Sequence, residues 1–439
     1  MATKQQFLSN SNIRKLAAEL LAAYKASWST ALSPEDFPAM LKAGGVMSPT
    51  GQFGIIFTPE LTAMISQFVI DVARALGPRA GHERTIRTLT LKEAQAFAQL
   101  GEDVDAAVKK LLEGLYEHNN DTFEYFDANH LIKLETGLRS LRLGTVRAML
   151  SMDYMSEVKS RRKDESPIKF EIGPTFGFKV ETFTFTVSEL CWVVELQGAY
   201  DHAEEEAKWL IDVMVSFLRC QYTQAPVLFP RPGEVEPHPI RPDGFTSAGI
   251  LFTDASPRMP VWTTPPHYAV NAALSEFVHT EAVQRTAALL CNPPAGSLAE
   301  RVSRGLGWLT RGRQAKDRSE RLLHFFTAIE ALLSSESKSD PVVDTIARYS
   351  GVILTEESRP RWEVAAELRA LYEYRSDLVH RGDRAILENS VNKAQWFAEL
   401  LFLLVLKKAD LSSKYMEFAK ELREASYGRP WSPRKEASE

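Results

Sequence analysis

The spacing of hydrophobic residues over positions 1–165 is mostly helical. Thr58 is followed by a proline, an acid and an apolar stripe at helical spacing, which are the features of a helix start. Ser33 begins the same combination of cap, proline and acids. The pattern therefore predicts helices after both cap residues, a third over residues 104–116 and a fourth within residues 131–149.

The period of the pattern changes after residue 165. Residues 168–172 alternate apolar and charged side chains, residues 176–187 include an alternation of phenylalanine and threonine, and residues 191–196 are largely apolar. Alternation and β-branched or aromatic content are typical of strands, so this region predicts two or three of them. A helix with a glutamate-rich start is predicted to follow over residues 203–222.

Proline marks the clearest break in the chain. Six prolines lie between Pro226 and Pro242, where they remove backbone donors and hold the segment extended. We interpret this segment as a linker or long edge loop, with a proline-rich recognition ligand as the alternative. The predicted fold class is α+β, mainly helical. Its predicted parts are a mostly helical region (1–165), a β-containing segment with a helix and the linker 226–242 (166–265), a helical C-terminal module (266–425) and a frayed tail (426–439).

Composition and charge exclude several classes of protein. The 439 residues are 44% hydrophobic and 25% charged, which is typical of folded soluble chains and not of disordered ones. The net charge of −5 excludes a globally basic nucleic-acid wrapper. Three widely spaced cysteines support neither a disulfide framework nor a zinc site, and no apolar run is long enough to span a membrane. We expect a cytoplasmic protein with no metal, no other cofactor and no membrane partner.

Two predicted helices near the C-terminus each place a charge within an apolar stripe. The first stripe consists of Leu322, Phe326, Ile329 and Leu333. The second consists of Leu368, Leu371, Tyr372, Leu378 and Val379. At 3.6 residues per turn, Glu330 lies inside the first stripe and Arg375 at the centre of the second. A lone buried charge is costly, so we predict that Glu330 and Arg375 contact each other.

His380 follows Arg375 by five residues, which is about 140° around a helix. Gly382 is a natural left-handed cap, so His380 is expected in the last helical turn, where the helix dipole and Asp377 favour its charged form. Histidine can transfer the proton of a ribose hydroxyl or leaving oxygen, and arginine can hold a phosphate. Local unwinding or a second copy of the helix would be needed to bring the two groups together.

Two predicted helices together resemble a known family. The first is apolar with a central glutamate, and the second, later in the chain, is rich in tyrosine and ends in Arg-Ser-x-x-x-His-x-Gly. The matching segments are Phe325-Phe326-Thr327-Ala328-Ile329-Glu330-Ala331-Leu332-Leu333 and Leu371-Tyr372-Glu373-Tyr374-Arg375-Ser376-Asp377-Leu378-Val379-His380-Arg381-Gly382. With intervening and closing helices predicted over residues 341–354 and 391–408, residues 318–409 resemble a HEPN domain, most closely of the Apea-like subgroup.

This resemblance implies an antiparallel bundle of four to five helices, a homodimer with the motifs at its interface, and metal-independent endoribonuclease activity that leaves a cyclic phosphate. It implies that Arg375 and His380 are catalytic, with Glu330, Ser376 and Asp377 in support. Many active members have Asn, Asp or His where this chain has Ser376. Such members commonly act as toxins or in defence against phage. A non-catalytic dimerisation or nucleotide- or RNA-binding module is the alternative.

A basic segment precedes the helix that carries Glu330. It includes Arg301, Arg304, Arg311, Arg313 and Lys316. These side chains are candidates to follow the phosphates of an RNA substrate, and a solvated helix face is the alternative. No catalytic pattern stands out in the first 265 residues. We therefore expect that region to sense a trigger, such as a phage product, a nucleotide or a regulatory protein, or to hold the nuclease inactive.

Overall fold

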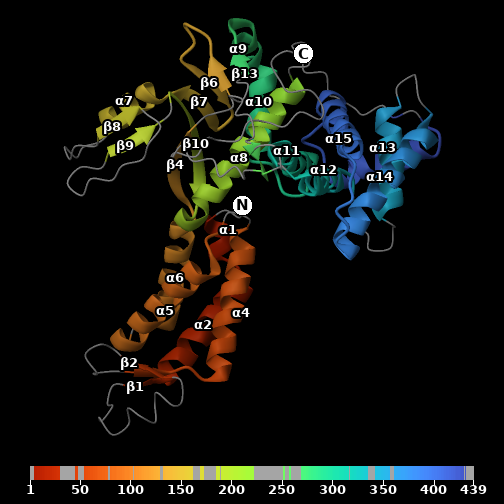
Figure 1. The fold of residues 1–439 in the computed structure, drawn as a ribbon. Coiled ribbons are helices and arrows are strands. Elements are labelled where there is room, and N and C mark those ends of the chain that lie inside the picture. Colours follow the sequence, from red (N-terminus) through yellow and green to blue (C-terminus); the bar gives the residue numbers. More distant parts are fainter. Residues whose placement is uncertain are drawn as a thin grey trace. The chain divides into compact units, whose positions relative to one another are not determined.

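The structure is a computed structural model in which the chain is mainly helical and includes a small four-stranded sheet (Figure 1). It describes residues 4–29, 45–47, 54–77, 80–101, 103–128, 132–161, 169–172, 184–187, 189–221, 251–252, 257–258, 268–315, 317–334, 342–355, 360–429 and 431. The expected cap Ser33, the proline-rich segment 226–242 and Lys316 lie outside these residues. A mainly helical α+β fold is therefore confirmed for the described part of the chain.

The chain forms two compact units, one of residues 1–125 and 195–207 and one of residues 126–194 and 208–439. These divisions differ in position from the predicted boundaries near residues 165 and 265. Among the described helices, none is long and apolar enough to cross a membrane.

The first unit is built around packed helices. These are α1 (Lys4–Leu8), α2 (Ser11–Ala26), α4 (Pro59–Leu76), α5 (Glu83–Leu100) and α6 (Val104–His118), with short strands β1 (Trp28–Ser29), β2 (Gly45–Met47) and β3 (Gly54–Ile56). Thr58 caps α4 by accepting the Leu61 N–H at 3.2 Å, with Pro59 in the first turn, as the sequence predicts. Ile65 and Phe68 on the apolar stripe of α4 are fully buried.

The helix predicted within residues 131–149 is wrong, because this region forms strands. They are β5 (Ile132–Leu134), β6 (Ser140–Leu143) and β7 (Val146–Leu150). Leu141 and Leu143 are buried on β6 while Ser140 and Arg142 are exposed, so the period is two. Gly144 has a φ of 59° in the β6–β7 turn, a left-handed value that glycine adopts without strain.

The sheet has the strand order β4-β10-β7-β6, with β4 (Asp121–Ala128) and β10 (Leu190–Gly198). Its β10–β7 and β7–β6 pairs are antiparallel. The strand prediction for residues 168–196 is confirmed in the described parts, β8 (Lys169–Ile172), β9 (Thr184–Val187) and β10. The remaining elements here are α7 (Ser151–Arg161), α8 (Tyr200–Gln221), β11 (Leu251–Phe252), β12 (Pro257–Arg258) and β13 (Tyr268–Val270). Helix α8 confirms the helix predicted over residues 203–222.

Helices make up the described C-terminal part of the second unit. They are α9 (Ala272–Val278), α10 (Glu281–Cys291), α11 (Leu298–Gln314), α12 (Arg318–Leu333), α13 (Val342–Leu354), α14 (Arg361–Arg381), α15 (Glu388–Lys408) and α16 (Tyr415–Ser426). Ser297 caps α11 by accepting the Glu300 N–H at 3.2 Å. The Glu300 carboxylate accepts from the Gly296 N–H at 2.7 Å, one residue before the position that a capping box requires.

Glycines let helix α11 approach its neighbours closely. A Cβ atom at Gly305 would lie 2.1 Å from the ring of Phe402 on α15, and one at Gly307 would lie 2.5 Å from the ring of Trp209 on α8. On the side of α12, a Cβ atom at Gly312 would lie 2.7 Å from a buried phenylalanine ring. Helix α11 is therefore packed on three sides. Because its glycines have no side chains, the neighbouring helices can approach it this closely.

We expect Gly305→Ala and Gly114→Ala to change stability in opposite directions. Alanine is the better helix former by ~1 kcal/mol, and a Cβ atom at Gly114 in α6 meets no atom within 4 Å, so that variant is expected to gain ~0.5–1 kcal/mol. At Gly305 the added methyl group overlaps the fully buried Phe402 ring, and the net loss is expected to be ~1–2 kcal/mol. Urea unfolding measures both, and a Gly305→Ala protein as stable as the parent would contradict the packing argument.

Candidate functional site

Helices α12 and α14 bring the predicted charge pair together. Arg375 Nη2 lies 3.1 Å from Oε1 and 3.2 Å from Oε2 of Glu330. The two side chains come from positions 45 residues apart in the chain. The contact predicted from the two apolar stripes is therefore confirmed.

Tyr372 completes this cluster. Its hydroxyl donates a hydrogen bond to Glu330 Oε1 at 2.9 Å, and the guanidinium carbon of Arg375 lies 5.3 Å from the centre of its ring. Burial, together with the negative charge of Glu330 beside it, raises the pKa of Tyr372 to about 12, so the hydroxyl remains a donor at neutral pH. Its position three residues before Arg375 on the same stripe was the signal that could have identified it.

The Glu330–Arg375 pair is less buried than its position in the stripes predicted. The two side chains are 21% and 20% exposed. The buried residues of α14, Val364, Ala365, Leu368 and Leu371, lie in the first half of the helix. The apolar stripe continues into the second half, where Leu378 is partly exposed and Val379 is exposed. Arg375 therefore lies at the edge of the bundle, with access to solvent.

His380 lies in the last turn of α14, as the Gly382 signal predicted. Gly382 has a φ of 71°, and its N–H donates to the Leu378 carbonyl at 3.1 Å. The His380 side chain is exposed, and among the described residues it makes no hydrogen bond or ion pair. Asp377, which was expected to support His380, instead lies 3.2 Å from Nη1 of Arg381. Ser376 is partly exposed beside Arg375.

The loop after α14 is anchored to the start of α12. Asp317 caps α12 by accepting from the N–H groups of Ser319 at 2.9 Å and Glu320 at 3.2 Å, and it also accepts from the guanidinium of Arg384. The Glu320 N–H in particular, with the other donors, holds the pKa of Asp317 below its ordinary value. This contact fixes the end of α14 that carries His380.

The predicted basic surface is wrong for Arg313, which has no exposed side-chain area and is ion-paired to Glu399 of α15. An arginine in that position cannot follow an RNA backbone. Three of its expected neighbours have partners within the protein, since Arg301 lies 4.2 Å from the Tyr415 ring centre, Arg304 pairs with Glu300, and Arg311 pairs with Asp212 at 3.2 Å. The sequence shows where the positive charges lie along the chain, but it does not show which side chains they contact in the folded protein.

No three histidine, cysteine, aspartate or glutamate side chains within the described part of the chain are placed to hold a metal ion. All three cysteines are free thiols. The side chains that the candidate site itself offers are an arginine, a tyrosine, a glutamate and a histidine.

We expect a double-mutant cycle on Glu330 and Arg375 to show a measurable coupling. Because the pair is half-buried, each single alanine variant is expected to lose ~1–2 kcal/mol of unfolding free energy, between the values for exposed and fully buried pairs. The expected coupling is ~0.5–1.5 kcal/mol. Lys393→Ala, which removes the more exposed Lys393–Glu367 pair between α14 and α15, is the matched control and should cost under ~0.5 kcal/mol. Equal costs for Arg375→Ala and Lys393→Ala in urea unfolding would contradict this assignment.

No family model, no curated protein and no solved structure matches this chain. The function proposed for Glu330, Tyr372 and Arg375, and for His380 at the end of α14, therefore rests on their own geometry.

Proposed function

We propose that the C-terminal bundle is a HEPN-type, metal-independent endoribonuclease that acts as a homodimer. The observation that carries this proposal is the orientation of Arg375 by Glu330 and Tyr372, five residues before an exposed histidine at the end of the same helix. A guanidinium held by two neighbours loses little conformational freedom when it binds a phosphate.

In the proposed reaction, His380 transfers protons and Arg375 stabilises charge. Neutral His380 takes the proton of a ribose 2′-hydroxyl, and the 2′-oxygen then attacks the adjacent phosphorus. The bond from phosphorus to the 5′-oxygen breaks, a protonated histidine gives its proton to that oxygen, and a 2′,3′-cyclic phosphate remains. Arg375 holds the non-bridging oxygens, on which negative charge increases in the transition state. Ser376, next to Arg375 on α14, supplies a supporting hydrogen bond.

The exposed end of the α14 stripe supports a dimer. Val379 is 48% exposed and Tyr374 is 37% exposed, whereas Val364, Ala365, Leu368 and Leu371 in the first half of the same helix are buried. Apolar side chains of this kind beside a catalytic group are typical of an interface. Around a two-fold axis, the same end of α14 in a second copy would bring two His380 residues to one phosphate, with one as base and one as acid.

In this proposal the protein acts in the cytoplasm as a toxin or an anti-phage effector, and the N-terminal region responds to the trigger. The exposed Arg381, next to His380, is a candidate contact for the RNA backbone. These assignments follow from the HEPN resemblance of residues 318–409.

One observation favours a second candidate, a non-catalytic dimerisation or nucleotide-binding module. Arg375 is already paired with Glu330, and His380 lies about 140° around the helix from it. Within one chain the two groups are not brought together. In that case the Glu330–Arg375 pair would serve only to hold α12 and α14 in register.

We expect His380→Ala to abolish RNA cleavage without unfolding the protein. Loss of a general acid–base is expected to lower the cleavage rate of a labelled RNA in EDTA about a hundredfold or more. Because the side chain is exposed, the unfolding free energy should change by less than ~0.5 kcal/mol. His279→Ala, which removes another exposed histidine, is the control and should cut at the parent rate. The nuclease assignment fails if the purified protein leaves RNA intact in EDTA or if His380→Ala cuts RNA at a rate close to that of the parent protein.

We expect Val379→Glu to convert the dimer to a monomer and to lower cleavage. A carboxylate at the interface would be desolvated without a partner, which destabilises the association. Ile70→Glu on α4 is the control, since Ile70 is exposed to a similar extent, and it should leave both properties unchanged. Sedimentation velocity measures the assembly state, and a Val379→Glu dimer would exclude this surface as the interface.

A further inference from the structure

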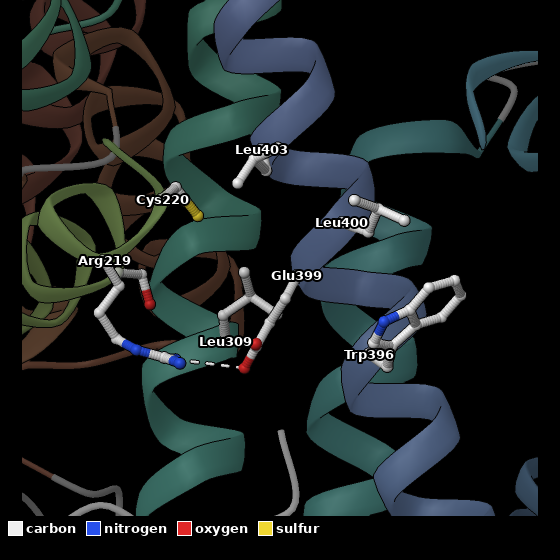
Figure 2. A pocket seen from close by; sticks show the side chains of 8 residues that line it. Arg219, Cys220, Leu309, Trp396, Glu399, Leu400 and Leu403 are labelled. Atoms are coloured by element: carbon white, nitrogen blue, oxygen red, sulfur yellow. Dashed lines mark hydrogen bonds and ion pairs between the residues drawn. The ribbon is translucent and has the colours of Figure 1, made fainter. Parts of the chain in front are cut away.

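A cavity of about 220 Å³ lies between helices α8, α11 and α15, on elements other than those that carry Arg375 and His380. Its lining residues among those described are Ser216, Arg219, Cys220, Leu309, Trp396, Glu399, Leu400 and Leu403. In Figure 2, Arg219 and Cys220 lie on one side and Trp396 and Leu400 on the other, with Glu399 between them. The cavity is partly open to solvent, and its volume exceeds that of an engineered cavity of ~150 Å³ that binds benzene.

The walls of the cavity are suited to a flat apolar body. Leu309, Leu400, Leu403 and the indole of Trp396 contribute hydrocarbon surface. Burial raises the pKa of the Cys220 thiol to about 12, so this side chain also remains uncharged at neutral pH. Trp396 remains 42% exposed, which leaves a large aromatic face accessible at this site.

Glu399 is the acidic residue among those that line the cavity, and only one of its two carboxylate oxygens accepts hydrogen bonds from described residues. Arg219 donates to Oε1 at 3.2 Å, Gln395 donates to Oε1 at 2.9 Å, and Arg313 donates to the same atom. Oε2 accepts no hydrogen bond from any described residue. A carboxylate oxygen has lone pairs for further donors, so Oε2 is an available acceptor on a lining residue.

The charges around Glu399 determine which donor suits it. Burial by itself would raise its pKa, but the positive charges of Arg313 and Arg219 outweigh burial and hold the pKa of Glu399 below its ordinary value. The carboxylate therefore stays ionised. The same two guanidinium groups repel a cationic ligand, and the apolar walls do not compensate a second negative charge. An uncharged ligand with an N–H group avoids both unfavourable charge interactions and can still donate a hydrogen bond to the carboxylate.

We propose that this cavity binds a small neutral heteroaromatic molecule, with the ring between Trp396 and the leucine side chains and a ring N–H donating to Glu399 Oε2. The site is independent of the proposed nuclease chemistry, because its residues lie on α8, α11 and α15. A hydrogen bond to a charged acceptor provides selectivity for ligands with an N–H over ligands of the same shape without one.

Indole and benzofuran test this proposal, because they share one shape and differ by an N–H in place of an oxygen. Isothermal titration calorimetry of the full-length protein should show saturable one-to-one binding of indole, about tenfold tighter than that of benzofuran. Absence of saturable indole binding at millimolar concentrations would overturn the proposal. Equal affinities for the two probes would also overturn it, because Glu399 would then make no contribution.

A matched pair of variants on α15 locates the binding. Leu403→Phe fills the cavity from a partly exposed position and should abolish indole binding, whereas Leu404→Phe, at the adjacent position that does not line the cavity, should retain it. Circular dichroism melting verifies that both variants are folded. Indole binding that persists unchanged in folded Leu403→Phe would place the ligand elsewhere and refute the assignment.

Discussion

The second unit depends on one partly buried carboxylate that is shared between helices. Glu399 of α15 accepts from Arg219 of α8 and Arg313 of α11, and through Gln395 it connects to Arg321 of α12. Each guanidinium would be costly to bury alone, so these helices can pack closely only when all partners are in place. The glycines of α11 permit the close approach, and the ionic network makes one arrangement of the helices preferable to the others.

A second ionic cluster on α12 and α14 differs from the first in a way that bears on function. Glu330, Tyr372 and Arg375 form a connected set, but they lie at the edge of the bundle and remain accessible to solvent. Arg313 is fully enclosed, whereas Arg375 keeps some access to solvent, which the phosphate-binding role that we propose for it requires. Both clusters contain an arginine that is paired with a glutamate. They differ in how far the arginine is enclosed, because Arg313 has no exposed side-chain area and Arg375 is 20% exposed.

Local signals in the sequence were reliable where a single helix start or stop was at issue. The cap at Thr58 and the left-handed Gly382 both act locally, within four residues, and the structure confirms both. The helix predicted within residues 131–149 is wrong because Leu141 and Leu143 alternate with exposed residues, as in a strand. The antiparallel pairing of β6 with β7 determines this period of two, and the pairing is a property of the tertiary structure.

The sequence by itself determined the helical character of the C-terminal module, the meeting of Glu330 with Arg375 and the place of His380 at a helix end. Each of these follows from spacing along one helix or from the cost of burying a lone charge. Only the tertiary structure decided that Arg313 is enclosed and Arg375 is accessible, because exposure depends on neighbours from distant segments. The cavity beside Glu399 likewise exists only where three helices meet, and no single segment encodes the space between them.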